Sequence, residues 1–181
     1  MDFAREPRPA DRADEIAALF TRTFSDSEGP KEGRLVGALA RDLVTTTRAV
    51  DLMVFVARED GALVGCIVFT RLRFSEDARS VYLLSPVAVA TGRQGQGTGQ
   101  ALLRYGLDEL RADGVDVAVT YGDPGYYARV GFVQITEDSA AAPQPLAQPE
   151  GWLAQSLTDR PLTPLRGASR CVAALDNPGY W

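Results

Sequence analysis

The spacing of apolar residues predicts two helices near the start of the chain. Residues 11–24 place four apolar side chains at helical intervals, behind acidic residues that suit a helix start. Residues 31–45 place three leucines on one face, at positions 35, 39 and 43. The stretch 25–30 between them is rich in serine, glycine and proline, and we expect a turn there.

From residue 52 onward the pattern changes to short apolar runs typical of strands. Residues 52–57 and 63–69 are two such runs on either side of Glu59-Asp60-Gly61, a sequence typical of a hairpin turn. A third strand is predicted at 81–90. Pro86 interrupts it, and because proline cannot donate to a sheet ladder we expect a bulge or a splay near this residue.

Helices and strands continue to alternate in the second half of the chain. The predicted order is a helix at 101–110, a strand at 115–119, a short helix at 124–130, a strand at 132–135 and a last strand at 171–175. Between these, residues 138–167 hold five prolines, yet their tryptophan and leucines predict that the excursion packs on the body. We therefore expect a single α/β (α+β) domain over 1–181, with a core at 3–136 and a closing segment at 168–175.

Composition and charge narrow the function classes. Hydrophobic residues make up 45% and charged residues 24%, as in ordinary globular proteins, and 181 residues are enough for a hydrophobic core. The net charge of -5 argues against nucleic acid as a partner, because phosphate binding leaves a basic surface. A cationic substrate is compatible with the acidic balance.

The chain contains no histidine, and this absence is more informative. It excludes Ser-His-Asp hydrolysis, Cys-His chemistry and histidine-based metal sites, so we expect no metal. Cys66 and Cys171 each lie in an apolar stretch, as expected of two buried thiols in a reducing compartment; a disulfide is the alternative.

Neither the first residues nor any apolar run of the sequence indicates a membrane protein. The first seven residues lack the apolar core of a signal peptide. No run approaches the roughly 18 apolar residues needed to cross a bilayer. We expect a cytoplasmic protein with no membrane partner.

The first candidate site is a glycine-rich turn between a strand and a helix. Residues 91–99 read Thr-Gly-Arg-Gln-Gly-Gln-Gly-Thr-Gly and run directly into the helix. This arrangement points free backbone N–H groups at an anion, and the helix dipole favours negative charge there. Glycines let the backbone approach a pyrophosphate closely.

Two nucleotide-binding patterns fail at this turn. In a dinucleotide motif counted from Gly95, the last glycine would fall on Gln100. In a Walker A loop counted from Gly92, Thr98 stands where lysine is required. The pattern that fits is Q-x-x-G-x-G, formed by Gln94, Gly97 and Gly99.

Three elements in order resemble the GCN5-related N-acetyltransferase (GNAT) family. The Q-x-x-G-x-G turn resembles the acetyl-CoA pyrophosphate loop of that family, and residues 84–89 resemble its splayed fourth strand. Tyr127, Gly131 and Phe132 match a Y-x-x-x-G-F segment near the end of the family core. The resemblance is closest to the YhbS-like branch and covers residues 15–132, although Thr91-Gly92-Arg93 departs from the Pro-containing tripeptide that is usual there.

The resemblance implies a fold, a reaction and a set of binding residues. The fold is a mixed, mostly antiparallel sheet of six or seven strands, splayed at the fourth and flanked by about four helices. The reaction is direct transfer of acetyl from acetyl-CoA to an amine acceptor in a ternary complex. The implied cofactor-binding residues are Val87, Ala88, Val89, Gln94, Gly95, Gln96, Gly97, Thr98, Gly99, Gln100 and Tyr127.

The same resemblance assigns catalytic roles. Tyr127 matches the tyrosine that protonates the departing CoA thiolate, a role that suits a hydroxyl with an ordinary pKa near 10. An aromatic anchor for the short helix is the alternative role, and Tyr126 is the alternative acid. Glu32 matches an acidic position of the branch and is the candidate base; Glu28 and Asp123 are further candidates for contact with the substrate.

The roles of two arginines, the acyl-transfer function and the oligomeric state each have alternatives. Arg93 and Arg129 are candidates to pair with cofactor phosphates, although exposed arginines usually pair with water. A non-catalytic acyl-CoA-binding domain and a transferase of another acyl group are the rival functions, and Tyr127 speaks against the first. Dimers are frequent in the family, so a homodimer is compatible with the resemblance.

Overall fold

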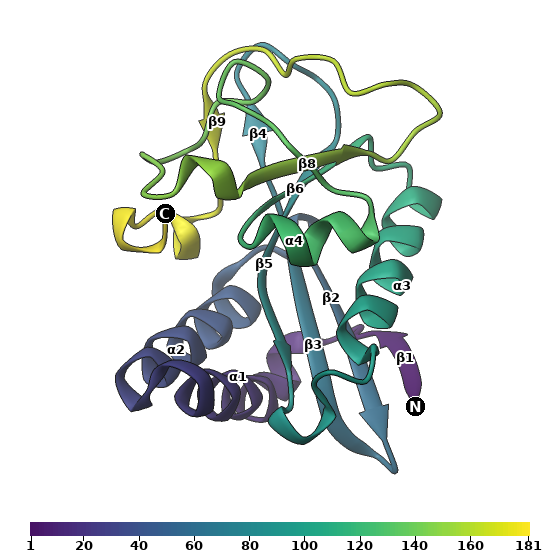
Figure 1. The fold of residues 1–181 in the computed structure, drawn as a ribbon, viewed down its shortest axis with the longest axis vertical. Helices are drawn as coiled ribbons and strands as arrows, with labels where there is room; N and C mark the ends of the chain where they lie inside the picture. Colours follow the sequence, from purple (N-terminus) through teal and green to yellow (C-terminus); the bar gives the residue numbers. More distant parts are fainter. The chain divides into compact units, whose positions relative to one another are not determined.

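Seven strands form the main sheet, in the hydrogen-bonded order β1-β2-β3-β5-β6-β8-β7. The computed structural model describes residues 1–181, and Figure 1 labels its helices and strands. The strands of the sheet are β1 (Asp2–Arg5), β2 (Leu52–Glu59), β3 (Ala62–Arg71), β5 (Val81–Val89), β6 (Val117–Tyr121), β7 (Val133–Gln134) and β8 (Trp152–Ser156). A separate antiparallel pair joins β4 (Arg73–Phe74) to β9 (Ser169–Arg170).

Four α-helices accompany these strands, so the mixed α/β fold predicted from the sequence is confirmed. They are α1 (Ala13–Glu28), α2 (Pro30–Thr46), α3 (Thr98–Ala112) and α4 (Pro124–Tyr127). The chain divides into two compact units: Met1–Phe69 with Pro86–Gly106, and Thr70–Ser85 with Leu107–Trp181.

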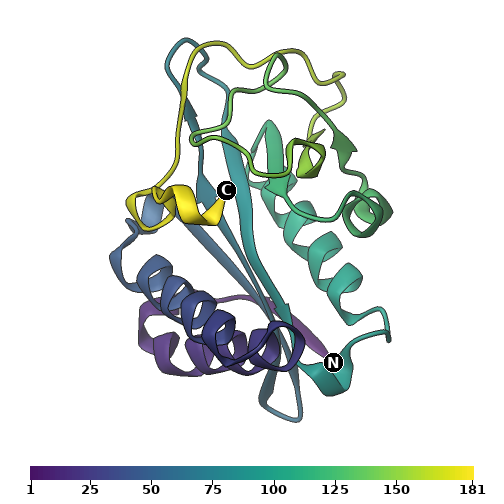
Figure 2. The same ribbon diagram turned by 60° about the vertical axis from the view of Figure 1, so that its left-hand side comes forward.

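In the first unit, α1 and α2 lie side by side (Figure 2). The predicted turn at 25–30 is wrong, because α1 continues to Glu28 and only Gly29 separates the helices. Gly29 has φ +97°, a left-handed conformation that glycine adopts without a steric penalty. Gly33 and Gly37 then let α2 approach α1: a Cβ on Gly33 would lie 2.5 Å from the carbonyl oxygen of Thr21.

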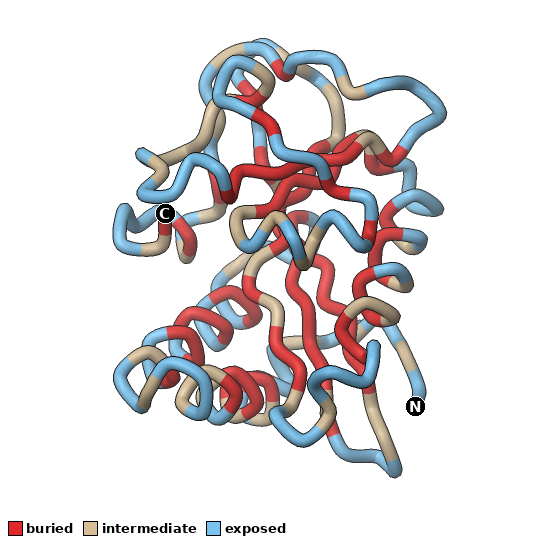
Figure 3. Tube along the Cα trace, in the orientation of Figure 1, coloured by how far each residue is buried: buried red, intermediate tan, exposed pale blue.

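The predicted hairpin between β2 and β3 is present. Asp60 and Gly61 form its turn with φ values of +50° and +81°. Both strands are buried over most of their length (Figure 3), and β2 buries every residue from Leu52 to Ala57. Burial of consecutive residues means that both faces of the strand are covered.

Strand β5 contains the bulge that Pro86 predicts. Two hydrogen bonds join the ends of the paired stretch, from Ala90 to Val64 and from Leu72 to Val81, and between them the chain paired with β5 advances eight residues, from Val64 to Leu72. Over the same distance β5 advances nine, from Ala90 back to Val81. In a regular antiparallel ladder the two counts are equal, so β5 carries one extra residue.

The parallel ladder between β5 and β6 is short. It joins Val81–Leu84 to Val117–Thr120, and its last pair is Leu84 with Thr120. The Thr120 hydroxyl donates to the carbonyl of Leu84 at 3.0 Å. The N–H of Gly122 turns to the other side and donates to the carbonyl of Gly151 at 2.9 Å. The ladder therefore ends just before Pro86.

In the second unit the proline-rich excursion supplies a strand that the sequence pattern did not predict. β8 pairs with both β6 and β7, antiparallel in each case. Trp152, which begins it, is completely buried and donates from Nε1 to the carbonyl of Ala140 at 2.8 Å. The last strand predicted at 171–175 is wrong: the strand is Ser169–Arg170, and Ala173–Leu175 is a 3-10 turn.

We expect Gly33→Ala to lower the free energy of unfolding by about 2 kcal/mol, because its Cβ overlaps the backbone of α1. Helix propensity alone would change stability in the opposite direction by up to about 1 kcal/mol, so the sign of the effect isolates the steric overlap. Urea denaturation measures it. Arg34→Ala, at an exposed position of the same helix, is the control and should change stability by less than about 0.5 kcal/mol; a stabilised Gly33→Ala variant would contradict the close packing.

Candidate active site

The glycine turn begins with a 3-10 helix, Thr91–Arg93, and ends at the first turn of α3. Gly95 and Gly97 adopt φ values of +71° and +83°, which a residue with a Cβ adopts only with strain. The carbonyl of Gly97 accepts the first helical hydrogen bond, from the N–H of Ala101 at 3.0 Å. Gly97 is therefore the N-cap of α3.

Three N–H groups follow this cap and have no partner within the helix. They belong to Thr98, Gly99 and Gln100, the first three helical residues. Around Gly92, Gly95 and Gly97, no atom lies within 4 Å of where a Cβ would stand, so the turn is open on its outer side. Free N–H groups, a helix dipole and an open approach are what a pyrophosphate requires.

Hydrogen bonds within the first unit hold the turn in place. Nε2 of Gln94 donates to the carbonyl of Val89 at 2.9 Å, which ties the turn to the end of β5. The Thr91 hydroxyl donates to Asp26 at the end of α1, at 2.5 Å. Gln94, predicted to bind the cofactor, therefore also shapes the loop.

Arg93 pairs with a carboxylate of the protein, whereas the sequence made it a candidate to pair with a cofactor phosphate. Its guanidinium forms an ion pair with Glu59 at the end of β2, with Nε 2.6 Å from Oε2. This pair anchors the turn to the β2–β3 hairpin. A carboxylate thus already neutralises the arginine that was a candidate for the cofactor phosphates.

The strand before the turn directs backbone N–H groups away from β3. Ala90 donates to Val64 on β3, and successive residues of an extended strand point in opposite directions. The N–H group of Val89 therefore points away from β3. Ala88 and Val89 are buried through their side chains, while this backbone group provides the polar edge.

Tyr127 is the last residue of α4, in the second unit. Asp123 caps this helix by accepting from the N–H of Gly125 at 2.9 Å, as the sequence suggested. The ring of Tyr127 packs edge-on against Tyr126 and Phe132, with centroids 5.1 and 5.8 Å away. Tyr127 thus has the packing of an aromatic anchor, and its hydroxyl is the group to which the sequence resemblance assigns chemistry.

Burial raises the pKa of Tyr127 well above its ordinary value, and the neighbouring Tyr126 adds to the shift. A hydrogen bond with Thr120 acts in the opposite direction and is the smaller effect. The hydroxyl therefore stays protonated through neutral and mildly alkaline pH. A group that keeps its proton under these conditions can serve as a proton donor.

The candidate bases lie in different places. Glu32 sits in the first turn of α2, half-buried, in the same unit as the glycine turn. Glu28, at the end of α1, is exposed. Asp123 is engaged as the cap of α4. The first unit thus holds the glycine turn, the β5 edge and Glu32, and the second holds Tyr127.

Two glycines hold Tyr127 in position, and sequence reasoning missed both of them. A Cβ on Gly122 would lie 2.7 Å from Cε2 of the Tyr127 ring. A Cβ on Gly151 would lie 2.9 Å from the carbonyl oxygen of Gly122. The Gly122-Asp123-Pro124-Gly125 string was the available signal for the first; nothing near Gly151 in the sequence indicates its partner.

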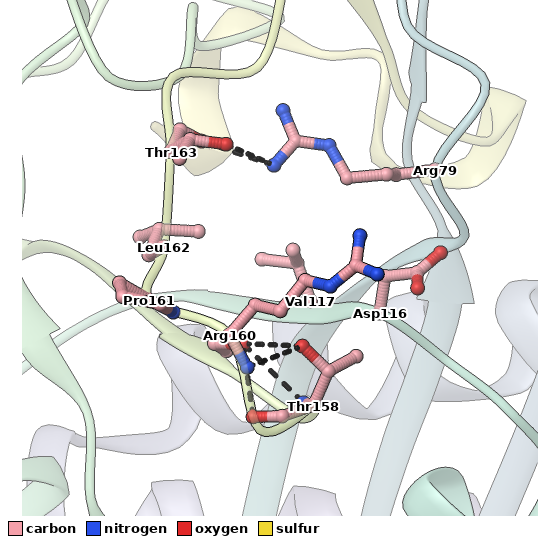
Figure 4. Close-up of a pocket in the computed structure, with 9 residues that line it drawn as sticks. Arg79, Asp116, Val117, Thr158, Arg160, Pro161, Leu162 and Thr163 are labelled. Atoms are coloured by element: carbon pink, nitrogen blue, oxygen red, sulfur yellow. Dashed lines mark hydrogen bonds between the residues drawn. The ribbon is translucent and has the colours of Figure 1, made fainter.

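A cavity of about 660 Å³ lies in the second unit at the start of β6 (Figure 4). Tyr121 lies at the opposite end of that strand. One wall is the segment 158–168, here called the strap. Arg79 donates from Nη1 to the hydroxyl of Thr163 at 3.0 Å and from Nη2 to the carbonyl of Pro164 at 2.7 Å. It also donates from Nε and Nη2 to Asp77, so its guanidinium is fully used in holding the strap.

The fold and the glycine turn together define a class of protein. A mixed sheet with an interrupted β5, followed by a glycine turn that caps a helix, is the fold of the CoA-dependent N-acetyltransferases. No helix of the chain is both long and apolar enough to span a membrane.

Comparison with known proteins gives the same class. Residues 51–134 match the family model described as an acetyltransferase (GNAT) domain. The Escherichia coli (strain K12) protein YjhQ, described as an uncharacterized N-acetyltransferase, is 36% identical over an alignment of 165 residues that covers 88% of this chain and 87% of that protein. The chain therefore belongs to the GNAT family.

Solved structures of GNAT proteins with bound cofactor are similar throughout the chain. Escherichia coli YhbS, a GNAT family N-acetyltransferase in complex with CoA, has a TM-score of 0.76 and 25% identity, covering 97% of this chain and 92% of that one. A GNAT family acetyltransferase from Brucella melitensis in complex with acetyl-CoA has a TM-score of 0.68 and 30% identity, covering 97% and 99%.

The contact between Asp77 and the strap predicts a pH dependence of stability. The Arg79 side chain lowers the pKa of Asp77, which also accepts from the N–H of Arg166 at 3.2 Å. Because the folded pKa is the lower one, this stabilisation is present above the unfolded value of about 3.9 and is lost as pH falls below it. We expect Asp77→Asn to cost about 2 kcal/mol at pH 7 and to flatten the loss of stability as pH falls below about 4.

Denaturation at several pH values measures both effects. Asp108→Asn is the matched control, because Asp108 pairs with Arg111 at an exposed position and its loss should cost less than about 1 kcal/mol. Equal effects of the two substitutions would contradict a special role for Asp77.

Proposed function

We propose that the protein transfers an acetyl group from acetyl-CoA to a primary amine of a small molecule or protein, by direct attack in a ternary complex. The observation that carries this proposal is the turn at Gly95 and Gly97, whose left-handed glycines cap α3 and leave its first N–H groups for an anion. The GNAT relatives that bind CoA and acetyl-CoA support the choice of cofactor.

The cofactor is bound mainly by backbone in this proposal. The N–H groups of Gly95 to Gln100 hold the pyrophosphate. The outward edge of β5 at Val87, Ala88 and Val89 binds the pantetheine arm and donates to the thioester oxygen. When the carbonyl becomes tetrahedral, such a donor stabilises the oxyanion.

Bond changes follow from the ternary complex. The neutral amine attacks the thioester carbon, the C–N bond forms, and the C–S bond breaks as the intermediate collapses. The proton lost by the amine passes to Glu32, directly or through water, and the hydroxyl of Tyr127 donates a proton to the departing thiolate. Solvent then restores the proton to Tyr127.

Acetyl-CoA binding tests the glycine turn. We expect Gly97→Ala to weaken the affinity about tenfold, because a Cβ strains the left-handed cap and tilts its N–H groups. Gly92→Ala is the matched control: Gly92 lies in the same turn, has no positive φ and has open space around it. Isothermal titration of both variants gives the comparison. An unchanged dissociation constant for Gly97→Ala, or no binding by the unaltered protein, would contradict the proposal that this turn binds acetyl-CoA.

Turnover tests the proton donor. We expect Tyr127→Phe to lower kcat about a hundredfold while the acetyl-CoA dissociation constant changes less than about threefold, because only the hydroxyl is removed. Tyr126→Phe removes the neighbouring hydroxyl and should retain activity. The raised pKa of Tyr127 also predicts no loss of rate from pH 8 to about 10. Thiol release from acetyl-CoA measures all three, and equal kcat values for the two variants would remove Tyr127 from the mechanism.

A further inference from the structure

A hollow of about 260 Å³ lies beside Gly122, at the end of β6. We call it the aromatic hollow, because its walls include the rings of Tyr121, Tyr180 and Trp181. The rest of its lining is Gly122, Ala147, Gln148, Gly151 and Gly179. All of these residues belong to the second unit, which also contains Tyr127.

One wall of the aromatic hollow is rigid. Tyr121 stacks on Trp181 with centroids 6.1 Å apart and an angle of 17° between the rings. Trp181 also packs edge-on against the buried Trp152, and its Nε1 donates to the carbonyl of Leu175 at 3.0 Å. These contacts fix the positions of two rings before any ligand binds.

The third ring lacks such partners. Tyr180 is half-buried, its hydroxyl makes no hydrogen bond and its ring packs against no other ring. The hydroxyl of Tyr121 accepts from the N–H of Gln148 at 2.7 Å, which leaves its own hydrogen for donation. The hollow thus presents one unpaired aromatic ring and two hydroxyl groups.

The aromatic hollow lies next to the proposed proton donor. Gly122 lines it, and the Tyr127 ring packs so closely on Gly122 that a Cβ there would meet the ring at 2.7 Å. A hydrogen bond from the N–H of Gly122 to the carbonyl of Gly151 joins two glycines of the lining, here called the floor glycines. A molecule in the hollow therefore contacts Gly122, the residue on which the Tyr127 ring packs.

The segments that build the hollow carry almost no positive charge. Between Ala112 and Asp159 the only basic residue is Arg129, and seven residues are acidic: Asp113, Asp116, Asp123, Glu137, Asp138, Glu150 and Asp159. Asp123 and Glu150 directly follow or precede the two floor glycines and are exposed. Such a distribution lowers the electrostatic free energy of a cation at this surface.

We propose that the aromatic hollow binds a second, non-reacting ammonium group of the acceptor, so that the acceptor class is an alkyl diamine or polyamine. This inference rests on the proposed function. The reacting nitrogen must be neutral when it attacks, so a site that holds a charged nitrogen throughout the transfer holds a different nitrogen. An aromatic ring and nearby carboxylates recognise an ammonium, which therefore belongs to another part of the same molecule.

Paired amines of equal chain length test the proposal. The rates of acetylation of 1,3-diaminopropane, 1,4-diaminobutane and 1,6-diaminohexane are compared with those of 1-aminopropane, 1-aminobutane and 1-aminohexane at saturating acetyl-CoA. We expect kcat/KM to be about tenfold higher for at least one diamine than for its monoamine, well above the factor of two that two reactive ends give.

Two variants assign the preference to the hollow. Tyr180→Leu removes the aromatic face and should reduce the preference to about twofold, whereas Tyr180→Phe keeps the ring and should retain most of it. Acetyl-CoA affinity, measured by titration, should be unchanged in both. The unaltered preference in Tyr180→Leu, or equal rates for every diamine and its monoamine, would overturn the proposal.

The results also separate this inference from the proposed function. Acetylation of monoamines that depends on Tyr127, without any preference for diamines, overturns the role of the aromatic hollow alone. Failure to acetylate any amine, together with no binding of acetyl-CoA, overturns the transferase function and this inference with it.

Discussion

The early end of the ladder between β5 and β6 is the constraint on which the functional geometry depends. Where the ladder ends at Leu84 and Thr120, other hydrogen bonds replace it. The Thr120 hydroxyl donates to the Leu84 carbonyl, and the N–H of Gly122 donates to the Gly151 carbonyl. Buried backbone groups must be paired, so these bonds make the break stable. Beyond this pair β5 has no further ladder partner in β6, and the chain leaves β6 at Tyr121 to enter α4 at Pro124.

Glycine is used in two physically different ways around this break. At Gly95 and Gly97 it permits a left-handed backbone, which shapes the turn that caps α3. At Gly122 and Gly151 it permits close approach, because a Cβ would overlap an aromatic ring or a carbonyl. The first pair leaves free N–H groups at the start of α3; the second lets the Tyr127 ring pack closely on the backbone. Hydrogen bonds of Gln94 and Thr91 keep the turn in shape before any ligand arrives, which limits the entropy lost on binding.

Several parts of the candidate site could be read from local patterns. The bulge followed from Pro86, the cap of α4 from Asp123, and the turn from the glycines between a strand and a helix. Other parts could not. The partner of Arg93 is Glu59 on a distant hairpin, and the strand that begins at Trp152 lies inside a proline-rich stretch whose pattern predicts a loop. In each case the deciding contact joins residues far apart in the chain.

The sequence by itself determined the alternation of elements, the interruption of β5 and the presence of a glycine turn between a strand and a helix, because periodicity, proline and glycine act through neighbouring residues. Only the tertiary structure decided the insertion of β8 between β6 and β7, the meeting of Gly122 with Gly151, and the gathering of Tyr121, Tyr180 and Trp181 around one hollow. Strand pairing and ring packing depend on which distant segments come together. That choice is made by the burial of the whole chain, and no short stretch of sequence records it.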